Sequence, residues 1–351
     1  MNKKKSWIFI TDWYPRETDP WNGIFIWEWL HFLKDEFDFT TLVWRAKQQH
    51  NRLLIQTAPF GKELIIETKG GLLTAWWFWI KFRKIIRKEL PQHHPILLGP
   101  LPWSWVLKIF YLGSRSYSLS EHQSVYFPIY FQNLPFWQKW LYGVGIKNAS
   151  KIMLVSNALK THISSIQPNA NCAVIPNRVS VPQLDVTPQK RKRIAIIGDL
   201  RNEVKGISQA LSWMNASPFL DFERVVIGNG PDEEMLKEQF SEVTFLPAMP
   251  HPNLMEFIAE TSVVVINSPF ETFSILAHEV QQLGTYLLCR KNGGPEDHSS
   301  EHVFWFENQS DFEQQSFRIL EKINQNQHPT PFIHEALSDE NCLKLWREAL
   351  Q

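Results

Sequence analysis

Short apolar runs alternate with longer amphipathic segments along the second half of the chain. Each run is continuous rather than alternating with polar residues, as in a strand that is covered on both faces. The runs predict strands at 194–197, 224–227, 243–246, 263–266 and 286–289. The segments between them predict helices near 206–215, 231–239, 251–260 and 273–283. This order predicts a parallel sheet wrapped by helices, which binds ligands at the carboxyl ends of its strands.

The first half repeats the same order less regularly, with strands predicted near 7–11, 39–44, 95–98, 116–119, 151–155 and 172–175. A chain of 351 residues exceeds one ordinary core, so two domains are expected. A polar, proline-punctuated stretch at 180–193 marks the predicted boundary. We therefore expect an α/β protein with two facing, doubly wound, Rossmann-like domains, at 1–182 and 183–335, and a cleft between them. A last helix within 336–351 is expected to pack back on the first domain through Trp346 and its neighbouring leucines.

The bulk composition excludes several classes of protein. Apolar residues make up 44% and charged residues 21% of the chain, which is typical of a globular protein rather than a disordered one. A net charge of zero argues against a nucleic-acid-binding protein that works by bulk electrostatics. The widely spaced Cys172, Cys289 and Cys342 indicate free thiols in a reducing compartment. The apolar stretch after the basic start ends at Asp12, too early for a signal peptide, and no apolar run reaches the roughly 18 residues of a membrane-spanning helix.

Two glutamates, Glu271 and Glu279, flank the predicted turn between the strand at 263–266 and the following helix. The backbone N–H groups of Phe273, Ser274 and Ile275 would lie at the start of that helix, where unpaired amides and the helix dipole favour a phosphate. Glu279 is expected two helical turns further along, roughly 10 Å away, which suits an extended ligand with two hydroxyl-bearing parts, such as a nucleotide-sugar. Two solvated glutamates on a surface helix are the alternative interpretation.

Six segments of the chain resemble signatures of glycosyltransferase family 4, and they occur in that family's order. They lie at 155–157, 174–179, 197–206, 227–231, 268–279 and 291–296. The resemblance implies a retaining enzyme of GT-B architecture that uses a nucleotide-sugar as its donor substrate, with no cofactor and no metal ion. Fewer segments in the first half of the chain resemble the family's signatures.

Breaking a sugar–diphosphate bond builds negative charge on the diphosphate, so cations and oriented N–H groups must converge there. Lys205 is the leading candidate for this role, with Arg201 beside it, although Lys205 could also be an ordinary surface lysine. By resemblance, Glu279 holds the ribose hydroxyls and Glu271 the donor sugar or its phosphate. Gly293 and Gly294 would let the backbone approach the sugar closely, although an ordinary turn would use the same pair.

The chain departs from the family's pattern at two positions of this predicted site. Asp199 occupies the place of the family's arginine, and Ser274 occupies a place that is usually glycine. These departures leave the identity of the donor sugar open. They also keep open a non-catalytic relative that acts as a membrane-bound assembly partner.

In the first half, residues 120–126 resemble the family's segment that contains a histidine after a glutamate. His122 is thereby the candidate for the acceptor side, where it would place or relay the proton of the attacking hydroxyl, unless it is simply a structural histidine. Gly23, after the first predicted strand, would let the backbone approach the diphosphate or the acceptor, or would serve only as a helix entry.

Two other kinds of site are excluded. The spacing of His298, Glu301 and His302 fits no strong metal-ligand pattern, so no metal site is expected. The dinucleotide fingerprint that begins at Gly228 lacks its third glycine, because Glu233 stands in that place, and this argues against a dehydrogenase.

Residues 72–88 place a cluster of tryptophans before a cationic run, and residues 102–105 and 134–140 add further aromatic side chains. Interfacial helices combine aromatic rings at headgroup level with cations toward anionic lipid. Large aromatic residues also fill protein cores, so peripheral membrane contact and core packing are both open.

Together these observations predict a cytoplasmic enzyme, at the inner face of the membrane if the aromatic surface is exposed. We expect it to transfer a sugar from a UDP- or GDP-linked donor to a glycan or lipid-linked glycan during cell-surface polysaccharide assembly. A nucleotide-sugar epimerase of the same architecture is the second enzymatic alternative.

Overall fold

The computed structural model describes residues 4–16, 22–182, 189–215 and 218–351, and it divides into two compact units. Unit 1 contains Met1–Asn177 and Leu343–Gln351, and unit 2 contains Arg178–Cys342. The predicted boundary after residue 182 falls five residues beyond this division.

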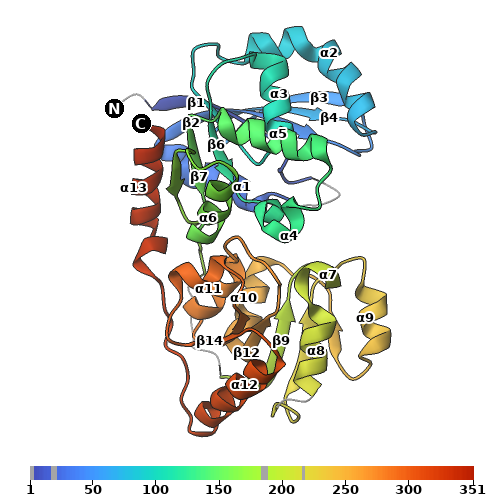
Figure 1. The fold of residues 1–351 in the computed structure, drawn as a ribbon, viewed down its shortest axis with the longest axis vertical. Helices are drawn as coiled ribbons and strands as arrows, with labels where there is room; N and C mark the ends of the chain where they lie inside the picture. The colour runs from blue at the N-terminus through green and yellow to red at the C-terminus, as the bar shows by residue number, and fades with distance from the viewer. Residues whose placement is uncertain (1–3, 17–21, 183–188, 216–217) are drawn as a thin grey trace. The chain divides into compact units, whose positions relative to one another are not determined.

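Unit 1 is built on an eight-stranded sheet in the order β3-β4-β2-β1-β5-β6-β7-β8, in which β3 is antiparallel to β4 and the other pairs are parallel (Figure 1). Its strands are β1 (Lys5–Thr11), β2 (Phe37–Arg45), β3 (Arg52–Ala58), β4 (Gly61–Glu67), β5 (Ile96–Leu98), β6 (Ser118–Glu121), β7 (Lys151–Leu154) and β8 (Cys172–Val174). Its helices are α1 (Ile24–Phe32), α2 (Leu72–Glu89), α3 (Trp103–Leu112), α4 (Pro128–Phe131), α5 (Phe136–Lys147), α6 (Asn157–Ile166) and most of α13 (Asp339–Leu350), with short 3₁₀ turns η1 (Leu33–Asp35) and η2 (Ser124–Tyr126). All six predicted strands are present, whereas β3 and β4 were not predicted.

The first sheet is covered on both faces, which explains the continuous apolar runs. On one face, Trp7 and Phe9 of β1 pack with α1 and α13, where the indoles of Trp29 and Trp346 stack with their centroids 4.7 Å apart. On the other face, α2 and α3 pack on Trp44 of β2 through edge-on indole contacts. Lys5 ties the end of α13 to β1, because its Nζ donates to the carbonyl oxygens of Leu350 and Gln351 at 2.8 and 2.6 Å.

Unit 2 contains a six-stranded, wholly parallel sheet in the order β11-β10-β9-β12-β13-β14. Its strands are β9 (Arg191–Ile197), β10 (Glu223–Ile227), β11 (Thr244–Leu246), β12 (Thr261–Ile266), β13 (Tyr286–Arg290) and β14 (Val303–Phe306). Its helices are α7 (Asn202–Lys205), α8 (Ile207–Asn215), α9 (Glu233–Gln239), α10 (His251–Glu260), α11 (Ile275–Gln282) and α12 (Gln309–Asn324), with 3₁₀ turns η3 (Gly294–His298) and η4 (Glu335–Leu337).

The side chains of β12 show how this second sheet is covered. Val263 and Val265 point to the layer of α8 and α12, and Val264 and Ile266 point to the layer of α10 and α11. Helices on both faces of a parallel sheet define a doubly wound domain and confirm the predicted order of strands and helices. None of the helices in the described part of the chain combines the length and the apolarity that crossing a membrane requires.

Candidate functional site

The carboxyl end of β12 leads into the loop that carries Glu271. This loop is joined to the loop after β13, because the Glu271 N–H donates to the Asn292 carbonyl at 3.2 Å and the Gly294 N–H donates to the Glu271 carbonyl at 2.9 Å. A Cβ atom on Gly294 would lie 2.3 Å from the backbone of Thr272, so only glycine allows this approach. The predicted Glu271 and the predicted glycine pair are thus brought together at one edge of the sheet.

Lys205 reaches the same carboxylate from a different loop. It is the last residue of α7, and its Nζ lies 2.7 Å from the Glu271 Oε1. The side chains are 29% and 15% exposed, so the pair lies near the surface and remains accessible to a ligand. Asn267 fixes the turn after α7, because its Nδ2 donates to the Gly206 carbonyl at 2.8 Å. Three loops at the carboxyl ends of β9, β12 and β13 therefore converge on one ion pair.

The helix after this loop begins later than the sequence predicts. Helix α11 starts at Ile275, with Ser274 as its N-cap, so Glu279 lies little more than one turn into the helix rather than two turns from Glu271 along one axis. Phe273 is buried, and its ring packs against those of His278 and His298. Burial lowers the pKa of His278 to about 3, so the imidazole that packs against Phe273 is uncharged at neutral pH. The phosphate site on the N–H groups of Phe273, Ser274 and Ile275 stays a prediction.

Ser274 explains why the family prefers glycine at this position. Its backbone is in the left-handed region, with φ of 62° and ψ of 84°, and a residue with a Cβ atom pays about 1 kcal/mol or more to adopt it. We therefore expect Ser274→Gly to raise the free energy of unfolding by about 1 kcal/mol, as measured by urea denaturation. Ser212→Gly, in the interior of α8, is the matched control and should lower it by roughly 0.5 kcal/mol. A destabilised Ser274→Gly protein would contradict the expected relief of strain.

Glu279 has a partner that the sequence did not reveal. His251, the first residue of α10, places its Nε2 2.6 Å from the Glu279 Oε1. Glu279 is 7% exposed, and His251 is 43% exposed through its side chain. The histidine orients a buried carboxylate toward the surface of unit 2. The sequence feature that could have pointed to His251 is a histidine followed by a proline at the start of a predicted helix.

Arg201 does not join the ion pair. It forms a 2.8 Å salt bridge with Asp199, and both side chains are about half exposed. Asp199, which by resemblance stands where the family has arginine, thus binds Arg201, the candidate to take over the role of that arginine. A role for Arg201 at the diphosphate stays a prediction.

The predicted acceptor-side residue, His122, follows β6 in unit 1. It is 8% exposed, its Nε2 lies 2.9 Å from the Ser120 Oγ, and its Nδ1 is buried without a partner among the described residues. Burial lowers the pKa of His122 to about 3, so the imidazole is neutral at physiological pH. The adjacent Glu121 fixes the loop by accepting hydrogen bonds from the N–H groups of His122 and Gln123.

Asp12 is a candidate that sequence reasoning missed. It directly follows β1, which is separated from β6 by β5 alone, so its carboxylate and His122 lie at the same edge of the first sheet. Burial raises the pKa of Asp12 to about 7, and its Oδ1 has no partner in the described structure. A carboxylate that titrates near neutral pH is suited to accept a proton from a hydroxyl. The sequence feature that could have pointed to Asp12 is its position as the first polar side chain after the first strand.

Gly23 acts as a helix entry. It caps α1 with φ of 67°, and a Cβ atom there would lie 2.5 Å from the Trp13 backbone. The adjoining residues 17–21 lie outside the described part of the chain. Contact between Gly23 and a substrate stays a prediction.

A family model matches the part of the chain that carries Lys205, Glu271 and Glu279. The model describes glycosyl transferases group 1, and it covers residues 183–338. This segment, residues 183–338, belongs to the glycosyl transferases group 1 family. The expected family is therefore confirmed.

A curated relative also resembles part of this chain. The GDP-mannose-dependent alpha-mannosyltransferase of Corynebacterium glutamicum is 28% identical over 113 residues, which cover 32% of this chain and 26% of that enzyme. The match thus spans about a quarter of the relative's length.

Solved structures resemble the fold of residues 1–351 over 98–99% of this chain. Sucrose-phosphate synthase from Thermosynechococcus elongatus has a TM-score of 0.69, at 14% identity and with 99% and 96% of the two chains covered. Anabaena HepE in complex with UDP has a TM-score of 0.67, at 14% identity and with 99% of each chain covered. The lipopolysaccharide outer core galactosyltransferase WaaB has a TM-score of 0.68, at 14% identity and with 98% and 99% covered. These similarities, with the two sheets, confirm the predicted GT-B fold.

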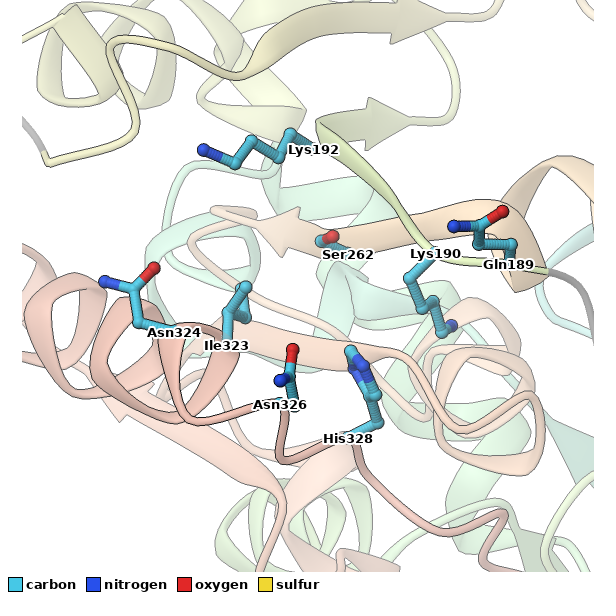
Figure 2. A pocket seen from close by; sticks show the side chains of 8 residues that line it. All are labelled: Gln189, Lys190, Lys192, Ser262, Ile323, Asn324, Asn326 and His328. Atoms are coloured by element: carbon cyan, nitrogen blue, oxygen red, sulfur yellow. The ribbon is translucent and has the colours of Figure 1, made fainter.

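Unit 2 also has a pocket of about 380 Å³ that lies away from the predicted donor site. Figure 2 shows its polar lining, which includes Lys190, Ser262, Asn326 and His328. Lys190 and Ser262 lie at the amino ends of β9 and β12, and Asn326 and His328 follow α12, whereas Lys205 and Glu271 follow the carboxyl ends of β9 and β12. Among the described residues, no group of three or more His, Cys, Asp or Glu side chains is placed to hold a metal ion.

Proposed function

We propose that this protein transfers a sugar, with retention of configuration, from a UDP- or GDP-linked donor to a glycan or lipid-linked glycan in cell-surface polysaccharide assembly. The observation that carries the proposal is the Lys205–Glu271 pair, 2.7 Å apart at the carboxyl edge of a parallel sheet, within the segment that the family model matches. Ligands of such sheets bind at this edge.

In the proposed reaction, Lys205 stabilises the diphosphate as the bond to the sugar breaks. The ammonium group exchanges its contact with Glu271 for the phosphate oxygens, and the charge that develops there is met by a cation already in place. Glu271 then orients the donor sugar, and the acceptor oxygen attacks on the face that the diphosphate leaves. No protein nucleophile is required in this scheme.

The remaining site residues divide between the nucleotide and the acceptor. We assign Glu279, positioned by His251, to the ribose hydroxyls, because a buried carboxylate with a fixed direction accepts two hydroxyl hydrogen bonds well. His122 and Asp12 are assigned to the acceptor hydroxyl. A neutral imidazole with a strongly lowered pKa is a weak base, so Asp12 is the better proton acceptor of the two.

Two relatives support the choice of nucleotides. The mannosyltransferase of Corynebacterium glutamicum is named for GDP-mannose, and the Anabaena HepE structure contains UDP. The aromatic side chains exposed on unit 1 support a lipid-linked acceptor at the inner face of the membrane.

Thermal unfolding in the presence of nucleotides tests the donor class. A nucleotide at 100 times its dissociation constant should add about 2.7 kcal/mol to the stability of the unit that binds it, which raises the melting temperature by a few degrees. We expect UDP or GDP to have this effect and ADP to have less. Indifference to every nucleotide would contradict the proposal and favour the non-catalytic assembly partner, for which the Asp199–Arg201 pair is the supporting observation.

Release of UDP or GDP from the nucleotide-sugar tests the reaction itself. If the protein transfers the sugar, the release of UDP or GDP should depend on an added acceptor. An epimerase would instead convert the donor sugar with no acceptor present. Donor conversion in the absence of acceptor, without nucleotide release, would replace the proposed function with epimerisation.

A further inference from the structure

Helix α2 directs large apolar side chains both into the core and into solvent. Trp79 is fully buried and packs edge-on against Trp44, with ring centroids 5.2 Å apart. Trp76, Trp77 and Ile80, by contrast, are 52%, 60% and 52% exposed. Core packing therefore accounts for only part of this aromatic cluster, because Trp76 contacts the ring of Phe110 at 5.2 Å between centroids and still leaves half of its surface exposed.

The same outward side of α2 carries a row of cations. Lys81, Lys84 and Lys88 are exposed, and the Lys81 Nζ lies 5.5 Å from the centroid of the Trp77 ring. No salt bridge in the described part of the chain involves a lysine or arginine of this helix. Their charge is thus available to an external anion.

A second exposed strip lies on α4 and α5. Ile129, Phe136, Trp137 and Trp140 are 52%, 84%, 51% and 55% exposed. The crossovers β4-α2-β5, β5-α3-β6 and β6-α5-β7 advance through the sheet in one direction, so α2, α3 and α5 cover the same face (Figure 1). The exposed side chains of α2 and α5 consequently belong to helices on the same face of the sheet of unit 1.

The charge of this part of the sequence is far from that of the whole chain. Residues 68–182 contain thirteen lysines and arginines against two glutamates, a net charge of +11, although the chain as a whole is neutral. The two glutamates offset little of this charge at the surface, because Glu121 is buried and Glu89 is bound by Lys62. Not all of these cations are available, since Lys108 is buried and Arg178 is paired with Asp339, but Lys81, Lys84 and Lys88 are exposed beside the aromatic side chains of α2. Exposed cations next to large apolar side chains are complementary to an anionic bilayer.

We propose that α2 and α5 form a membrane-docking surface that binds anionic lipid headgroups through its lysines and arginines and inserts Trp76, Trp77, Ile80, Phe136, Trp137 and Trp140 at the interface. Lipid explains the composition better than nucleic acid does, because the aliphatic Ile80 and Ile129 gain nothing from base stacking but gain from contact with acyl chains. The inference goes beyond sugar transfer, since docking needs neither donor nor acceptor.

Sedimentation with vesicles tests the docking surface. The protein of residues 1–351 should bind vesicles of phosphatidylcholine with 30% phosphatidylglycerol and bind pure phosphatidylcholine at least about tenfold more weakly in 150 mM salt. Trp76→Ser/Trp77→Ser and Lys84→Glu/Lys88→Glu should each lower the partition coefficient for the anionic vesicles about tenfold or more. Because the four replaced side chains are exposed, the variants should keep the circular dichroism spectrum and melting temperature of the parent.

Phe317→Ser/Lys322→Glu on α12 is the matched control, since it removes an exposed ring and reverses an exposed cation in unit 2. It should bind anionic vesicles like the parent. The proposal is overturned if the parent does not bind anionic vesicles, if neutral and anionic vesicles bind equally, or if the control loses as much binding as the α2 variants. It is also overturned if the α2 variants affect only RNA binding or only self-association, because the surface would then serve that partner.

Discussion

Replacing Lys205 with alanine is expected to lower kcat for sugar transfer by about 10²–10³-fold, the effect of removing one preorganised group that stabilises transition-state charge. The folded protein should lose little stability, because the Lys205–Glu271 pair is partly exposed and such pairs contribute about 1 kcal/mol or less. A large kinetic effect with a small effect on stability would distinguish a functional cation from a structural one. The measurement is steady-state release of UDP or GDP with acceptor present, together with urea unfolding.

Lys237→Ala is the matched control for this experiment. Lys237 forms a pair of the same length, 2.7 Å, with Glu233 on α9, and its side chain is 40% exposed. Its replacement should leave kcat unchanged. Equal activity of the Lys205→Ala enzyme and the parent would remove Lys205 from the site and would leave Glu271 with no catalytic partner. Glu271→Ala should also reduce transfer, and the double variant should lose less than the product of the two single effects, because both residues act on one donor.

Asp12→Asn is expected to lower kcat/KM for transfer about 10²-fold or more, as loss of a general base typically does. The parent's kcat/KM should rise with pH through about 7, since Asp12 must lose its proton to act as a base and burial raises its pKa to about 7. The variant should lose this dependence. Asp38→Asn, on the exposed side of β2, is the control and should keep both the rate and the pH profile.

The same substitution should stabilise the protein above acidic pH. The pKa of Asp12 is raised from 3.8 to about 7, so between these values the unfolded chain has lost the proton that the folded chain retains. Stability therefore falls as pH rises through this window, and the ionised, buried carboxylate costs at most about 4 kcal/mol above pH 7. Asp12→Asn removes this cost. The variant's advantage over the parent in free energy of unfolding, measured with urea, should therefore grow from pH 4 to pH 8. An advantage that does not change with pH would show that Asp12 titrates normally.

Much of the second sheet follows directly from sequence. The run at 263–266 is uninterrupted because α8 and α12 cover one of its faces and α10 and α11 the other, and burial on both faces leaves no polar positions. The hairpin β3–β4 was missed for the opposite reason. Its outer strand is an edge strand with only partly buried or exposed side chains, so it shows neither an apolar run nor a regular alternation.

The donor side of the site was more predictable than the acceptor side. Lys205, Glu271 and Gly294 come from loops that follow strands with clear apolar runs, so their meeting at one edge follows from the order of the strands. The pairing of His251 with Glu279 depends on how α10 packs beside α11, and sequence spacing contains no information on that packing. Asp12 was missed because its significance comes from burial, which raises its pKa, and a lone aspartate after a strand does not reveal its surroundings.

The return of α13 to the first sheet has a consequence for synthesis on the ribosome. Unit 2 is one continuous segment, whereas unit 1 needs residues 343–351 for completion. The indole of Trp29 therefore cannot stack on Trp346 until more than three hundred further residues have been translated. We infer that the second domain to emerge is the first that can fold completely, and that a nascent chain exposes the apolar face of α1 to chaperones until α13 has been translated.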